Sequence, residues 1–84
     1  MSLSPEDKQK LRDAFQRALE RDPAGADRPF TLEGMNASVT HRHLIANTLK
    51  GDHFFDSVEV LIKEGKGTID DYVKQVENIK FPKP

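Results

Sequence analysis

The sequence predicts an all-α fold, a small irregular four-helix bundle with a long ordered loop between its first two helices. In four segments apolar residues recur every three or four positions, polar residues suited to N-caps precede these segments, and Pro or Gly follows them. The 84 residues are expected to form a single helical domain. Its helices should span about 5–21, 39–50, 53–64 and 69–80, with a loop at 22–37 and a tail at 81–84.

The first helix has the clearest boundaries. Ser4 is a good N-cap, Pro5 suits the first helical position, and Pro23 ends the segment. At 100° per residue the apolar side chains fall within an arc of roughly 140°; they are Leu11, Ala14, Phe15, Ala18 and Leu19.

The loop at 22–37 is polar in its first half and apolar in its second. Phe30, Leu32 and Met35 are too apolar to be left together in solvent. We therefore expect this half to pack as a lid across the helices.

The capping residues predict where the remaining helices begin and end. The second is expected to start near Ser38 or Thr40 and to stop at Gly51. The third is expected to begin at the N-cap Asp52 and to stop at Gly65. This tight junction predicts that the two helices meet at a corner. The fourth helix is expected to start at the N-cap Thr68, with a capping box to the carboxylate three residues later.

Composition excludes several classes of function. The net charge of −1 gives no basic excess for phosphate binding, and the absence of cysteine excludes disulfides and thiolate chemistry. No apolar run approaches the ~20 residues that cross a bilayer. A cytoplasmic protein is the expectation, and no motif for a cofactor is visible.

The three histidines do not predict a metal site. His41 and His43 point about 160° apart on one helix, whereas helical metal ligands are usually three or four positions apart. His41 falls in the apolar arc, so a partly buried, hydrogen-bonded histidine is the preferred interpretation.

One short segment has a recognisable resemblance. Residues 56–61, Asp-Ser-Val-Glu-Val-Leu, resemble the Asp-Ser-Leu attachment sequence of acyl carrier proteins. The resemblance implies a phosphopantetheine arm on Ser57. In that family the serine starts a helix, whereas Ser57 lies inside a predicted one, so the carrier function is the weaker of two alternatives.

Nucleic-acid binding is the other alternative. Residues 38–64 could form a helix-turn-helix, and Arg42, His43 and Lys50 make one side mildly positive. However, the expected recognition helix carries Asp52 and Asp56 in its first two turns, and its connecting turn is expected to be too short.

The leading hypothesis is a non-enzymatic protein-protein interaction or regulatory module, either with a protein partner or as a homodimer. No nucleophile elbow or phosphate loop points to an enzyme. Val60 falls on the polar side of its helix, and several aromatic and aliphatic side chains have no obvious place in the core. The residues expected to bind a partner are Phe30, Leu32, Met35, Phe55 and Val60.

Overall fold

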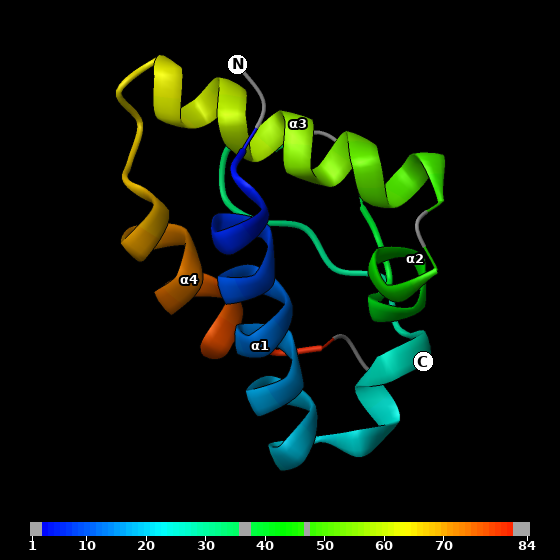
Figure 1. Ribbon diagram of the computed structural model, residues 1–84. Helices are drawn as coiled ribbons and strands as arrows, with labels where there is room; N and C mark the ends of the chain where they lie inside the picture. The colour runs from blue at the N-terminus through cyan, green and yellow to red at the C-terminus, as the bar shows by residue number, and fades with distance from the viewer. Residues whose placement is uncertain (1–2, 36–37, 47, 82–84) are drawn as a thin grey trace.

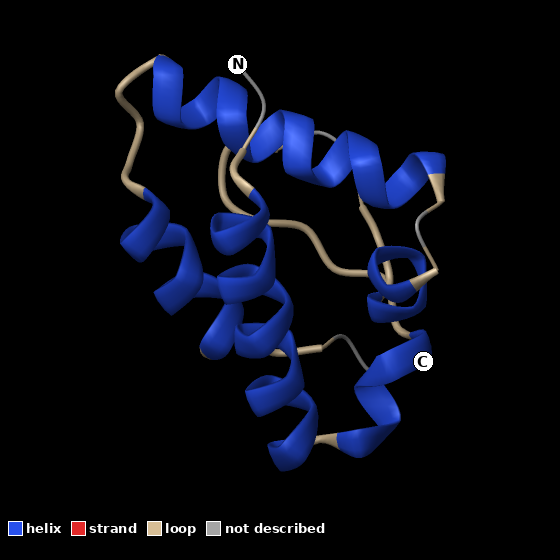
Figure 2. Cartoon of the chain, viewed as in Figure 1, coloured by secondary structure: helices blue, strands red, loops and turns tan. Residues whose placement is uncertain are grey.

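Helices make up the regular structure of the chain. The computed structural model describes residues 3–35, 38–46 and 48–81 (Figure 1). The helices are α1 (Pro5–Arg21), α2 (His41–Ile45), α3 (Leu49–Lys63) and α4 (Ile69–Glu77), and a 3-10 helix, η1 (Pro23–Asp27), follows α1. Within the described part of the chain no strand is formed (Figure 2), which confirms the all-α prediction.

The helices are packed around α1. Helix α4 lies alongside α1, while α3 runs across the N-terminal end of α1 at a steep angle and packs against α2 at its own start (Figure 1). The loop after η1 passes under α3 before it reaches α2. This arrangement leaves one long side of α3 without a helical neighbour among the described residues.

Several predicted helix ends are confirmed. The Oγ of Ser4 accepts a hydrogen bond from the Asp7 N–H at 3.1 Å. The predicted capping box of α4 is formed, because the Thr68 hydroxyl accepts from the Asp71 N–H at 3.2 Å and the Asp71 carboxylate accepts from the Thr68 N–H at 2.9 Å. These hydrogen bonds lower the pKa of Asp71. Gly65 follows the end of α3 with φ +74°, as a C-terminal glycine should.

The predicted junction between the second and third helices is wrong. Helix α2 ends at Ile45, and α3 begins at Leu49 rather than at 53. Thr48 is the N-cap of α3, since its hydroxyl accepts from the Gly51 N–H at 3.3 Å and donates to the His43 carbonyl at 3.1 Å. Gly51 is therefore not a stop. It lies inside α3, and the position needs glycine because a Cβ there would be 2.5 Å from the His43 carbonyl oxygen.

The loop after α1 is held by backbone pairing and by an aromatic side chain. Phe30 and Val39 exchange two N–H to carbonyl hydrogen bonds of 3.0 Å each. Helix α4 ends at Glu77, earlier than the predicted residue 80, and the chain beyond it places Phe81 over Gly25. The loop predicted at 22–37 thus contains η1 in its first half and the buried side chains of Phe30 and Leu32 in its second, and residues 36–37 lie outside the described residues.

Phe15 is at the centre of the core. Its fully buried ring lies 4.4 Å from that of Phe30, 5.6 Å from Phe54 and 6.3 Å from His41, measured between centroids. His41 is 6% exposed, more deeply buried than the partly buried histidine that the sequence predicted, and burial lowers its pKa.

Candidate functional site

Three of the five predicted partner-binding residues lie in the core. Phe30, Leu32 and Phe55 are each at most 4% exposed, so the expectation that they form an accessible surface is wrong. The ring of Phe55 is covered by the cations of Lys8 and Arg12 on α1, at 5.7 and 5.1 Å from its centroid. These aromatic and aliphatic side chains complete a thin core.

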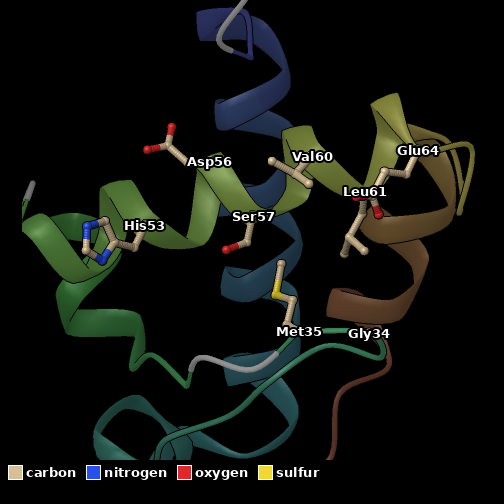
Figure 3. Close-up of a pocket in the computed structure, with 8 residues that line it drawn as sticks. All are labelled: Gly34, Met35, His53, Asp56, Ser57, Val60, Leu61 and Glu64. Atoms are coloured by element: carbon tan, nitrogen blue, oxygen red, sulfur yellow. The ribbon is translucent and has the colours of Figure 1, made fainter.

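The other two residues, Met35 and Val60, lie together in an open groove. We call this the α3 groove; it has a volume of about 560 Å³ and runs between α3 and the 32–35 segment (Figure 3). Val60 is 51% exposed, and Met35 is half-buried. The groove is lined by Gly34, Met35, His53, Asp56, Ser57, Val60, Leu61 and Glu64.

A tight turn forms one wall of the groove. The Met35 N–H donates to the Leu32 carbonyl at 3.1 Å, and Gly34 adopts φ +87°, which favours glycine. Leu32 is buried and anchors the turn. Its neighbour Met35 extends towards α3 near Ser57 (Figure 3). The core thus positions an adaptable apolar side chain at the surface.

The opposite wall is one face of α3. His53, Asp56 and Val60 are separated by three and four positions, so they form a row along the helix. Leu49 extends this row towards the start of α3 and is 77% exposed. Ile45, across the turn from Leu49, is 61% exposed. From Leu49 to Val60 the row is about 16 Å long at 1.5 Å per residue.

The groove has an acidic rim. Asp56 and Glu64 are exposed at its edge, and a second hollow of about 440 Å³ adds Glu33. The two hollows share Gly34, Leu61 and Glu64. None of the three carboxylates forms an ion pair with a described residue. The cationic side chain lining the second hollow is Lys66.

A buried tyrosine lies at the far end of these hollows. Tyr72 is 2% exposed and lines the second hollow. Burial raises the pKa of its hydroxyl, and the charges of Asp71 and Glu33 raise it further. Tyr72 therefore stays neutral and acts as a packing side chain with a hydroxyl near the rim.

The groove residues do not form a catalytic constellation. Ser57 is half-buried in the middle of α3, and no hydrogen bond joins it to His53 or Asp56. A serine without a base within hydrogen-bond reach is not an activated nucleophile. In the described ranges no three histidine, aspartate or glutamate side chains gather as metal ligands.

Sequence reasoning missed Leu49 and Ile45 as surface residues. Both lie within the helix predicted over 39–50, whereas α2 ends at Ile45 in the structure. The signal that could have corrected this was Thr48, whose hydroxyl suits an N-cap. With α3 starting after Thr48, Leu49 falls on the same face as Val60.

Comparisons with known proteins give no relative from which a function could be transferred. No family model matches the chain, and neither the curated proteins nor the solved structures contain a match. Over the residues that the structure describes, none of the helices has the length and apolarity to span a bilayer.

Proposed function

We propose that this chain is a non-enzymatic protein-interaction module, and that its α3 groove accepts a segment of another protein. The observation that carries the proposal is the exposed side chain of Val60 beside Met35, within a hollow that has carboxylates at its edge. An apolar centre with a polar rim is the usual composition of a protein interface.

A partner protein explains the groove better than a second copy of this chain does. In a symmetric dimer the same patch meets itself, so the net negative rim of one copy would face the net negative rim of the other. Like charges opposed in an interface are unfavourable, so the rim disfavours homodimers formed through this groove.

The geometry gives the two alternatives less support. The connection from Ile45 to Leu49 has the length of a helix-turn-helix turn, but α2 has only five residues and Asp52 and Asp56 are exposed on α3. An acidic helix face repels phosphates. Ser57 is preceded by two turns of α3 and therefore differs from the helix-starting serine of acyl carrier proteins.

The proposal is tested by recovery of the partner with matched variants. Val60→Lys adds a positive charge inside the groove, and Gln16→Lys adds the same charge on the exposed side of α1. We expect a protein that co-purifies with the natural chain from its own organism to be lost with Val60→Lys and retained with Gln16→Lys. If both variants retain the same proteins, the groove is not the binding site. Concentration-dependent sedimentation that Val60→Lys abolishes would point to a homodimer instead.

A further inference from the structure

We infer that the segment bound in the α3 groove is a cationic amphipathic helix, with apolar anchors on one face and Lys or Arg beside them. This inference rests on the proposed function and specifies the chemistry of the partner. It follows from the spacing of the exposed α3 residues and from the carboxylates around them, which form no ion pair with a described residue.

The spacing favours a helical occupant. Leu49, His53, Asp56 and Val60 follow one another at intervals of four, three and four positions. This is the row of side chains that a helix presents to a second helix packed along it. The row is about 16 Å long, which corresponds to about three helical turns of a partner. The described residues offer no open sheet edge to which an extended peptide could add a strand.

The charges select a basic occupant. The rim of the two adjoining hollows contains three exposed carboxylates, those of Glu33, Asp56 and Glu64, against the single Lys66. The formal charge of these lining residues is therefore −2 with His53 neutral, from three negative charges and one positive charge. None of the carboxylates is neutralised by an ion pair within the described part of the chain. A partner with Lys or Arg at the groove edge supplies that neutralisation, and an acidic partner is repelled.

The apolar contacts provide the anchors. Val60 and Leu49 are 51% and 77% exposed, and Met35 is half-buried with a flexible thioether. Leu-sized side chains one or two turns apart on a partner helix can cover them. Methionine adapts to side chains of different shape, which suits a surface that accepts apolar anchors. The apolar contacts thus provide the affinity, and the rim carboxylates determine which charge the bound helix carries.

The test uses the full 84-residue chain labelled with 15N and two synthetic amphipathic peptides of about 18 residues, roughly five helical turns. Both peptides carry the same leucine face, and their remaining positions are lysine in one and glutamate in the other. We expect the lysine peptide to shift the amide signals of Met35, His53 and Val60, and to bind more weakly as salt is added. The glutamate peptide should bind at least about tenfold more weakly, since several rim contacts change sign.

Two matched pairs of charge-removing substitutions distinguish attraction by the rim carboxylates from attraction by the net charge of the protein. Asp56→Asn with Glu64→Gln should weaken binding of the lysine peptide by about two- to fivefold for each charge removed. Asp13→Asn with Glu20→Gln removes the same two charges from the exposed side of α1 and should leave the affinity unchanged. Val60→Lys should abolish the shifts.

The outcomes distinguish this inference from the proposed function. If the two peptides shift the groove signals with equal affinity, the groove binds helices but the inferred charge of the partner is wrong. Shifts confined to α1 or α4, or the absence of shifts with either peptide, would contradict both. Equal losses from the two charge-removal pairs would show that the attraction is not localised at the rim.

Discussion

The packing of Phe81 against Gly25 offers a quantitative test of how the loop after α1 is held. A Cβ added at Gly25 would lie 2.3, 2.5 and 2.7 Å from three ring carbons of Phe81. The ring itself contacts Phe30, with 6.0 Å between centroids, so it is held from two sides. Gly25→Ala should therefore destabilise the protein, although η1 does not require glycine for its backbone conformation.

The expected magnitude follows from two opposing effects. Replacing glycine by alanine at a compatible φ stabilises a protein by about 0.4–1 kcal/mol through the unfolded chain. Overpacking costs about 1–3 kcal/mol, and here the whole ring must move because its Cγ is among the close atoms. We expect Gly25→Ala to lower the free energy of unfolding by about 1–2 kcal/mol.

A double-mutant cycle isolates this contact. Phe81→Ala alone should cost about 3 kcal/mol, at the low end for a buried phenylalanine because the side chain lies at the edge of the core. With the ring absent, Gly25→Ala should become neutral or stabilising by up to about 1 kcal/mol. The coupling between the two positions is then about 1–3 kcal/mol.

Urea unfolding followed by far-ultraviolet circular dichroism measures all four proteins. A total stability of roughly 4–13 kcal/mol is typical for 84 residues, which leaves room for both substitutions. Equal costs of Gly25→Ala with and without the Phe81 ring would refute the packing described here. So would a stabilising effect of Gly25→Ala in the natural sequence.

Three further outcomes are expected from the other packing features. Gly51→Ala should lower the free energy of unfolding by about 1–3 kcal/mol because the added Cβ meets the backbone of α2. Gly65→Ala has open space around its Cβ and should lower it by about 1–2 kcal/mol for the positive φ alone. Urea unfolding should show a lower midpoint for Gly51→Ser than for Gly51→Ala, while Gly65→Asn should be nearly neutral. Thr48→Ala should lower the free energy of unfolding by about 1 kcal/mol and increase amide exchange at the start of α3. Burial lowers the pKa of His41 in the folded state, so the stability that neutral His41 contributes is fully present above the ordinary pKa of 6.5 and is lost as the pH falls below it. In thermal melts as a function of pH, His41→Leu should flatten this loss and His53→Gln should not.

The parts of the fold that depend on local chemistry could be predicted from the sequence. Ser4 with Pro5, and Thr68 with Asp71, mark helix starts because their side chains satisfy N–H groups within one turn. Gly65 marks an end because the chain adopts a positive φ there. In each case the residues that decide the structure are neighbours in the sequence.

The junction between α2 and α3 could not be predicted in this way. Gly51 fits a helix stop as well as a close approach between two helices, and the sequence alone does not distinguish these uses. The distinction depends on the His43 carbonyl, which reaches Gly51 only once both helices are packed. Thr48 has the same ambiguity, because its hydroxyl serves the end of one helix and the start of the next.

The candidate site was predictable in part, for a related reason. Val60 was identified from its angle around a helix, a local property, and it is exposed. The burial of Phe30 and Phe55 depends on side chains distant in sequence, such as Phe81 and Arg12, that cover them. No periodicity within one segment reveals such a cover, so the surface expected from these aromatic residues was wrong.

The exposed residues of the groove differ from the buried residues that build the fold. Leu32 is buried and fixes the turn, while its neighbour Met35 is left at the surface. Leu61 contributes to the core from the same helix on which Val60 and Asp56 face solvent. Exposed positions of this kind usually change stability by less than about 0.5 kcal/mol when substituted. Folding therefore does not require an apolar residue at position 60 or carboxylates at the rim, so substitutions at these positions test partner binding without unfolding the protein.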